Sequence, residues 1–257
     1  ISGIVKHIVW DLGADHPDEI IPELKVKVVA EDGYAPTPTP QEPCLGALTV
    51  NHEGQLYNTV AIGSQCWFRE NLNVGTMVNG STNHTNNNVV EKYCYNNDAS
   101  NCAIFGGLYL WGEAMNYSPS TSTGAQGLCP PGWHIPSNAD WCELVTLLDP
   151  SVPNCFFTTL IVSYSAGWKL KETGTAYWYT NTNATNSSGF SARGGGQRRN
   201  FGGSYGYGFE YRYQNAYFWA SSSNLSYYLN SEGRVTRGAN TNVGTAYSIR
   251  CIRDSSW

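Results

Sequence analysis

Eight cysteines are the residues whose chemistry is clearest in this sequence. Structural zinc sites need Cys pairs separated by roughly two to four residues or Cys/His clusters, but here the closest pair, Cys94 and Cys102, encloses seven residues and the five histidines are scattered. We therefore interpret the even number as four disulfides, which form in an oxidising compartment. Spacing alone leaves roughly a hundred pairings open. The cysteines are Cys44, Cys66, Cys94, Cys102, Cys129, Cys142, Cys155 and Cys251.

Catalytic motifs are weak in this sequence. Residues 202–206, GGSYG, formally match GxSxG, but a nucleophile elbow needs a strand before it and a helix after it, whereas Gly and Tyr flank this stretch. Asp140 and Glu143 lie close together, but acidic residues near the start of a helix ordinarily stabilise its macrodipole. A glycosidase pair is defined by a separation in space that sequence does not give. We expect that the chain is not an enzyme.

Arg193, Arg198 and Arg199 form the one basic cluster of a chain whose formal net charge is −5. Nucleic-acid affinity depends on many Lys and Arg residues that neutralise phosphates, so we expect no nucleic-acid partner. The three arginines themselves are expected to be solvated or paired with carboxylates.

Aromatic side chains gather between residues 205 and 228 among Asn, Ser, Arg and Gly. Adaptable recognition surfaces have this composition, because rigid amphipathic anchors alternate with small hydrogen-bonding residues. Aromatic faces can also stack on sugar rings. By contrast, we expect Trp133, Trp141 and Trp219 to pack in the core. The predicted ligand-binding residues are Tyr205, Tyr207, Tyr211, Arg212, Tyr213 and Asn215.

The surface composition is typical of an exported protein. Only 14% of the residues are charged, so neutral polar side chains must supply most of the surface, as is common in secreted proteins. No run approaches the ~18 apolar residues of a membrane span, and no transmembrane segment is expected. The first residues lack the charged-then-apolar order of a signal peptide. We expect an extracellular or cell-surface location, with any export signal upstream of residue 1.

The elements that must position these residues fall into three parts. Residues 4–10 and 23–31 alternate well enough to predict two strands, which we assign to the end of a β-sandwich-like module at 1–33. Four prolines at 34–43 predict an extended linker. Residues 44–257 follow as one domain.

Several elements of this domain are predicted by local patterns. Alternating runs around His52-Glu53-Gly54 indicate a β-hairpin. The composition of residues 76–90 predicts an Asn-rich loop with few side chains that could pack against the rest of the domain. Apolar spacing predicts one helix at 107–118 and a second after an N-cap at Ser137.

The C-terminal part is expected to combine long loops with short β-prone segments, such as those at 216–223, 226–232 and 246–254. The stretch 194–219, rich in Gly, Tyr and Arg, predicts ordered, glycine-hinged loops. Ligand binding is expected in loops at roughly 193–217 and 224–245.

From Cys44 to Asp254 the chain resembles the Fibrobacter succinogenes major paralogous domain, a module of surface and secreted proteins of Bacteroidetes and Fibrobacteres. The matching stretches occur in family order. They are GQLYNTVAIGSQCWFRENL (54–72), YCYNNDASNCAIFGGLYLWGEAM (93–115), GLCPPGWHIPSNADWCELVTLLDP (127–150), WKLKETG (168–174), NSSGFSARGGGQR (186–198), YFWASSS (217–223) and YSIRCIRD (247–254). A shorter match, at 7–17 and 23–33, resembles the closing strands of a β-sandwich module.

The resemblance implies an α+β, C-type-lectin-like fold with two helices, short twisted strands and long loops. It also implies four disulfides: Cys44–Cys66, Cys94–Cys102, Cys129–Cys251 and Cys142–Cys155. Related sulfatase-modifying enzymes use a pair of C-terminal thiols, but no cysteine lies between Cys155 and Cys251 here. The sugar-binding tripeptides of calcium-dependent lectins are missing too. No cofactor is expected, and a structural Ca²⁺ held by carbonyl and Asn/Asp oxygens stays an open alternative.

Two functional hypotheses follow. The first is a non-catalytic recognition or adhesion domain that binds a glycan or a surface protein through its aromatic- and Asn-rich loops. The second is a structural subunit of a surface appendage or filament, in which residues 1–33 join neighbouring copies and the lectin-like domain is displayed.

Overall fold

The computed structural model describes residues 43–118, 124–152, 161–202, 204, 206–222, 225–239 and 244–254. The chain divides into two units between Pro40 and Gln41, and all described residues belong to the second. The strands predicted at 4–10 and 23–31 and nearly all of the linker at 34–43 therefore lie outside the described residues.

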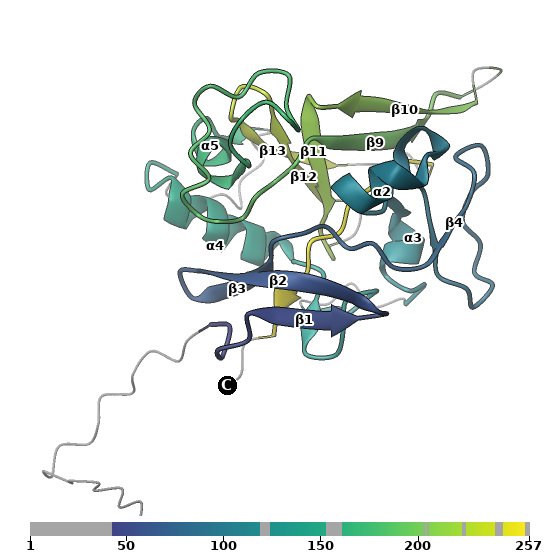
Figure 1. The fold of residues 1–257 in the computed structure, drawn as a ribbon, viewed down its shortest axis with the longest axis horizontal. Coiled ribbons are helices and arrows are strands. Elements are labelled where there is room, and N and C mark those ends of the chain that lie inside the picture. Colours follow the sequence, from purple (N-terminus) through teal and green to yellow (C-terminus); the bar gives the residue numbers. More distant parts are fainter. Residues whose placement is uncertain are drawn as a thin grey trace, which may run out of the picture. The chain divides into compact units, whose positions relative to one another are not determined.

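An antiparallel sheet, a mixed sheet and a small strand pair make up the β-structure of the described residues (Figure 1). The first sheet has the order β1 (Thr49–His52), β2 (Gln55–Ile62), β3 (Gln65–Phe68), β15 (Ile252–Arg253), β7 (Trp133–His134). The second runs β6 (Tyr109–Leu110), β14 (Ala246–Tyr247), β9 (Gly195–Asn200), β11 (Asn215–Trp219), β12 (Leu225–Asn230), β13 (Val235–Ala239), β8 (Ile161–Ser163), and β10 (Tyr207–Arg212) pairs with β9. The third sheet pairs β4 (Thr76–Met77) with β5 (Glu91–Lys92).

Four short helices and one turn of 3₁₀ helix accompany the sheets in the described part of the chain. These are η1 (Tyr95–Asn97), α2 (Ala99–Phe105), α3 (Trp111–Ala114), α4 (Asn138–Leu148) and α5 (Ala166–Leu170). The fold is thus α+β, as predicted, although two helices were expected. The finer assignment to the C-type-lectin-like class stays a prediction.

The hairpin predicted around His52-Glu53-Gly54 is confirmed. β1 and β2 pair antiparallel with His52 opposite Gln55, and Glu53 and Gly54 both have positive φ. Positive φ at both central residues is the requirement of a tight turn whose twist matches the flanking strands.

The helix predicted after Ser137 is also confirmed. Ser137 and Asp140 form a reciprocal capping box at the start of α4. Trp141, Leu144 and Val145 are buried on the inner face of α4.

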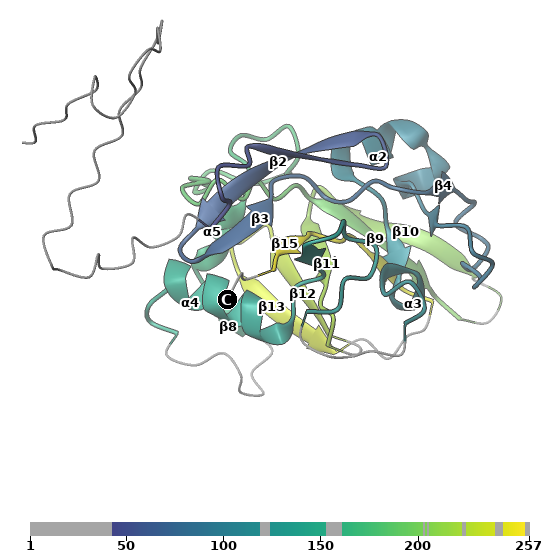
Figure 2. The same cartoon turned by 90° about the horizontal axis from the view of Figure 1, so that it is seen from below.

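One aromatic core lies between α4, α5 and the strands β11 to β13 (Figure 2). Trp141 is its centre, with ring contacts to Trp67, Phe190, Phe218 and Tyr227. A second core joins Trp133 and Trp219 to residues of β2, β3 and β14. The three tryptophans predicted to be buried are therefore core residues.

Three of the four predicted disulfides are present. Cys44–Cys66 closes the opening strands, Cys94–Cys102 ties η1 to α2, and Cys129–Cys251 joins the turn before β7 to the last strands. Cys142 is disulfide-bonded as well, and its predicted partner Cys155 lies outside the described residues.

The helix predicted at 107–118 is wrong in length. Tyr109 and Leu110 instead form β6, because they pair with Tyr247 and Ala246 of β14. α3 then ends at Ala114, and Asn116 with its neighbour Tyr117 takes positive φ. Long-range strand pairing has overridden the local helix signal.

The β-prone segments predicted at 216–223, 226–232 and 246–254 contain most of β11 and β12 and all of β14 and β15, whereas β9, β10 and β13 form in stretches that were predicted as loops. β9 to β13 occupy much of 193–217 and 224–245. The Asn-rich stretch 76–90 is mostly an exposed loop, as predicted, but it is anchored where Gly80 and His84 are buried and where β4 pairs with β5.

Arg193 and Arg199 pair with the carboxylates of Glu172 and Glu210, as predicted for the basic cluster, but Arg198 does not and accounts for part of this packing. The guanidinium of Arg198 is fully buried and donates to the carbonyl oxygens of Gly80, Thr82 and Gly244. It also lies 3.8 Å from the ring centroid of Tyr207. The side chain thus links the 76–90 segment to the second sheet.

Candidate ligand-binding site

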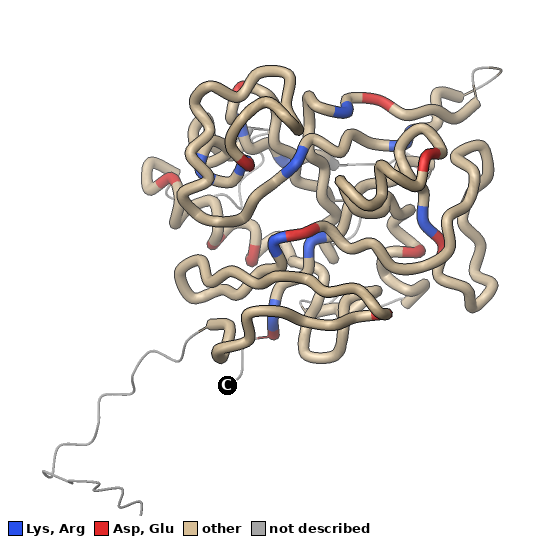
Figure 3. Tube along the Cα trace, viewed as in Figure 1, with Lys and Arg blue, Asp and Glu red and all other residues tan. Residues whose placement is uncertain are grey.

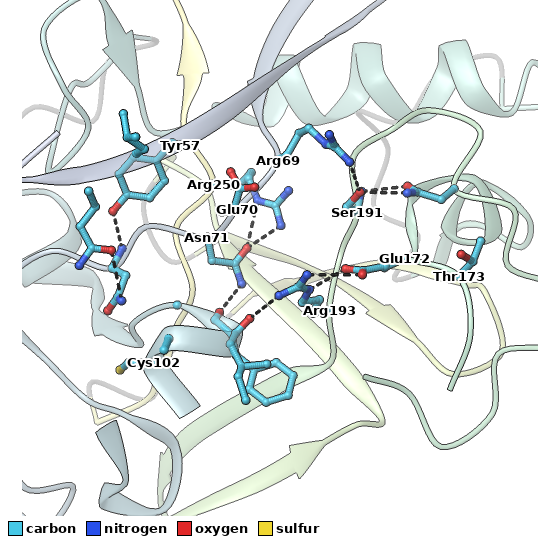
Figure 4. A pocket seen from close by; sticks show the side chains of 18 residues that line it. Tyr57, Arg69, Glu70, Asn71, Cys102, Glu172, Thr173, Ser191, Arg193 and Arg250 are labelled. Carbon is cyan, nitrogen blue, oxygen red and sulfur yellow. Dashed lines mark hydrogen bonds and ion pairs between the residues drawn. The ribbon is translucent and has the colours of Figure 1, made fainter. Parts of the chain in front are cut away.

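A polar hollow of about 370 Å³ opens between the first sheet, α2 and the segment that leads into β9 (Figure 4). Most of its lining consists of hydrogen-bonding or charged side chains. The lining residues are Gln55, Leu56, Tyr57, Arg69, Glu70, Asn71, Asn73, Cys102, Ala103, Ile104, Phe105, Gly106, Glu172, Thr173, Asn186, Ser191, Arg193 and Arg250. Charged positions are sparse along the chain, and basic and acidic positions adjoin one another in the middle of the view (Figure 3).

Arg250 is a fixed, buried part of this lining. Its Nε and Nη2 donate to Asn71 Oδ1 at 3.0 and 2.7 Å, and Nη1 donates to the carbonyl oxygens of Phe68 and Phe190. Asn71 in turn donates to the carbonyl of Phe105 at 2.7 Å. These bonds join the segment after β3, α2 and the last strands, so they hold one side of the hollow rigid.

The two carboxylates of the hollow are both engaged. Glu172 forms an ion pair with Arg193, with 2.6 Å between Oε2 and Nε. Glu70 accepts hydrogen bonds from the backbone nitrogen and side-chain amide of Asn58, both at 2.8 Å. Arg69 is exposed, and its Nη2 lies 3.4 Å from Ser191 Oγ.

Three tyrosines, Tyr177, Tyr179 and Tyr213, lie outside the lining but form a cluster in contact with two of its residues, and this cluster is called the tyrosine rim here. Arg193 lies 4.1 Å from the centroid of Tyr177, and Phe105 contacts the rings of Tyr177 and Tyr213. Tyr179 contacts Tyr213 with centroids 5.5 Å apart and is 66% exposed. Because Phe105 and Arg193 belong to the lining, the rim adjoins the wall of the hollow through these two residues.

The backbone that carries Tyr213 is unusual. Tyr211 and Tyr213 have φ of 62° and 65°, a region that bulky residues rarely adopt and that is costly to hold. Gly196 makes the arrangement feasible, because a Cβ there would collide with the carbonyl oxygen of Glu210 and lie 2.7 Å from the nitrogen of Arg212. Tyr179 N donates to Tyr213 O at 2.9 Å and ties the two parts of the rim together.

The structure disperses the predicted ligand-binding residues. Tyr213 is in the tyrosine rim, and Arg212 lies 4.9 Å from its ring centroid and donates to Asn101. Tyr211 is 39% exposed, and its ring packs toward that of Tyr217. The side-chain amide of Asn215 donates a hydrogen bond to the hydroxyl of Tyr217.

None of the predicted residues that the structure describes belongs to the lining of the hollow. Tyr207 stacks on the buried Arg198, so part of its ring belongs to the interior of the second sheet. Tyr205 lies outside the described residues. Whether any predicted residue binds a ligand stays a prediction.

Sequence reasoning missed Tyr177, Tyr179 and the polar lining. The two tyrosines stand outside the aromatic-rich stretch that drew attention. A signal for the lining was present, however, since nearly all of it comes from stretches that carry the family resemblance, such as WKLKETG (168–174) and NSSGFSARGGGQR (186–198).

A second hollow, of about 380 Å³, is more neutral. It lies beside the β1–β2 turn and is lined by His52, Glu53, Val74, Gly75, Thr76, Val89, Val90, Asn116, Gln126, Gly127, Leu128 and Cys129. The histidine in its lining already has a hydrogen-bond partner, because His52 Nε2 lies 2.9 Å from the carbonyl oxygen of Leu128.

The described residues contain no group of three or more His, Cys, Asp or Glu side chains arranged to hold a metal ion. The open alternative of a structural Ca²⁺ bound by carbonyl and amide oxygens stays a prediction. Among the described helices, none combines the length and apolar character that a membrane crossing requires.

The fold and the site together describe a disulfide-stapled α+β domain with a rigid polar hollow. The sequence profile of the Fibrobacter succinogenes major domain matches residues 60–253, and the chain belongs to this family. Comparisons with curated proteins and with solved structures give no match.

Proposed function

We propose that this chain is a non-catalytic, extracellular recognition domain that binds a glycan in the polar hollow, with a sugar ring against the tyrosine rim. Sugars present hydroxyl groups and apolar ring faces, and the site offers partners for both. The observation that carries the proposal is the direct contact between the lining and the rim through Phe105 and Arg193. Tyrosine supplies a large, rigid, amphipathic contact of this kind.

The rigidity of the hollow supports specific binding. Arg250, Asn71 and Arg193 each make several hydrogen bonds to elements far apart in sequence. A site whose side chains are already ordered loses less conformational entropy when a ligand binds.

The state of the carboxylates supports recognition over hydrolysis. A glycosidase needs one carboxyl group that delivers a proton and a second that acts as base or nucleophile. Glu172 is committed to Arg193, and Glu70 accepts from both nitrogens of Asn58. Both groups are therefore placed as charged hydrogen-bond acceptors.

The disulfides support the extracellular part of the proposal. Three disulfides in one domain are typical of proteins that fold in an oxidising compartment. The C-type-lectin-like fold belongs to the same proposal, and the link between the turn before β7 and the last strands agrees with it.

The test is a glycan array probed with the full chain, followed by titration of the tightest ligand. Tyr179→Ala is expected to weaken binding by about tenfold or more, as is common when an exposed aromatic anchor is truncated. Tyr164→Ala is the matched control, because Tyr164 is 67% exposed but lies between β8 and α5. If no glycan binds, or if the two variants lose equal affinity, the proposal is wrong.

A further inference from the structure

Three guanidinium groups face one hollow, with only two carboxylates beside them. Arg69, Arg193 and Arg250 carry the positive charges, and Glu70 and Glu172 carry the negative ones (Figure 4). The lining thus has one more positive than negative group, although the chain as a whole has a formal net charge of −5. The net charge of the lining is therefore positive, opposite in sign to the net charge of the whole chain.

Within the described part of the chain, one of these arginines has a carboxylate partner. Among the described residues, Arg193 pairs with Glu172, and neither Arg69 nor Arg250 has a carboxylate oxygen within 4.0 Å. The buried Arg250 is held by neutral acceptors, an amide oxygen and two carbonyl oxygens. A buried charge without a counter-ion is costly, so a negative group in the hollow would be stabilised.

The electrostatics of Arg250 agree with this geometry. Burial lowers its pKa to about 9, Arg193 and Arg69 act in the same direction, and Glu70 and Glu172 oppose them. The three cations therefore repel one another across the hollow.

Arg69 is the cation that a ligand can reach. It is exposed, and the one described hydrogen bond of its side chain, to Ser191 Oγ, is long at 3.4 Å. Most of its N–H donors remain available in a planar fork, the geometry that binds carboxylate or sulfate oxygens in pairs.

We infer that the hollow selects acidic glycans, and that Arg69 binds the carboxylate or sulfate group of the ligand. This inference rests on the proposed function and adds the ligand class to it. The sugar ring lies against the tyrosine rim, and the anionic group completes the charge balance of the three arginines.

The test compares matched pairs of oligosaccharides by titration of the full chain. One series carries carboxylates, namely an oligogalacturonate and sialyllactose, each beside its carboxyl-reduced form. The other carries sulfate, namely a sulfated galactan oligosaccharide beside its desulfated form. We expect the acidic member of at least one pair to bind about tenfold more tightly, with a preference that falls as salt rises. The series that shows the preference identifies the anionic group.

Arg69→Gln is expected to abolish the preference while leaving thermal unfolding unchanged, since the side chain is exposed. The control is Arg199→Gln, which alters an exposed arginine of β9 outside the lining. This variant is expected to retain the preference for the acidic oligosaccharide. Equal binding of acidic and neutral members, or a preference that survives Arg69→Gln, would overturn the inference while leaving a neutral-glycan site intact. Binding of no member, together with an empty glycan array, would overturn the proposed function as well.

Discussion

At the scale of single residues, His84 shows how burial controls protonation. Its side chain is fully buried, stacks on Tyr93 with 4.0 Å between ring centroids, and has no hydrogen-bond partner for either ring nitrogen among the described residues. Burial, assisted by the charge of Arg198, lowers its pKa from 6.5 to about 3. Glu113 Oε2, 4.0 Å from His84 Nδ1, is itself buried, and burial raises its pKa.

This histidine predicts a loss of stability in acid. The folded protein holds His84 neutral, whereas the unfolded chain takes up a proton below about pH 6.5. His84 therefore does not reduce the free energy of unfolding above that pH. Below it, the free energy of unfolding decreases as the pH falls toward 3. Protonation of Glu113, whose pKa is raised, acts in the opposite direction and offsets part of the loss.

His84→Phe keeps the ring stack and removes the titration. Relative to the parent protein, we expect it to be more stable by about 1–2 kcal/mol at pH 5 and by less at pH 7. Urea unfolding at both pH values measures the difference. An identical loss of stability between pH 7 and pH 5 in the two proteins would contradict this role.

At the scale of elements, the β9–β10 hairpin places Tyr213 of the tyrosine rim. Gly196 of β9 lies beneath Glu210 and Arg212 of β10, and its absent side chain lets the two strands close. Tyr213, in the tyrosine rim, follows directly at the end of β10.

Gly196→Ala is expected to destabilise the protein by about 1–3 kcal/mol, from the collision and the positive φ together. It should also weaken glycan binding, because Tyr213 would shift. The matched control is Gly202→Ala, since Gly202 has φ of 77° but nothing within 4 Å of a Cβ. The control should lose only about 1 kcal/mol and keep its affinity. Equal losses in denaturant titrations would show that contact with β10 is unimportant.

The elements also show where sequence reasoning succeeds and fails. The β1–β2 turn and α4 are specified locally, by Glu53-Gly54 and by the cap at Ser137, so they were predictable. β6 depends on pairing with β14, more than a hundred residues away in the chain, and its helix-like spacing was misleading. The hollow and the tyrosine rim are likewise assembled from segments that lie far apart in the sequence. The sequence alone therefore could not predict that Arg69 and Tyr179 belong to one candidate site.

At the scale of the whole molecule, disulfides of very different loop length hold the domain. Cys129–Cys251 spans 122 residues, whereas Cys94–Cys102 spans 8. The family resemblance predicted both pairs, which spacing alone could not. Their sulfur atoms belong to buried residues, so loop length is the main difference between them.

Removing the longer link should therefore cost more. In the chain-entropy model, loss of Cys129–Cys251 destabilises the domain by about 5 kcal/mol and loss of Cys94–Cys102 by about 2.5 kcal/mol. Double Cys→Ala variants compared by thermal and urea unfolding measure the two values. A larger effect for the shorter link would mean that local strain or packing, not chain entropy, dominates.

The central claim is that the hollow and its tyrosine rim bind a glycan. Backbone amide shifts of the full chain, followed by NMR while the tightest array glycan is added, locate the ligand directly. We predict the largest changes at Asn71, Ser191, Arg193 and Tyr179, which the hollow and rim bring together. Changes confined to the second hollow, around His52 and Gln126, with none at these four residues, would contradict the claim.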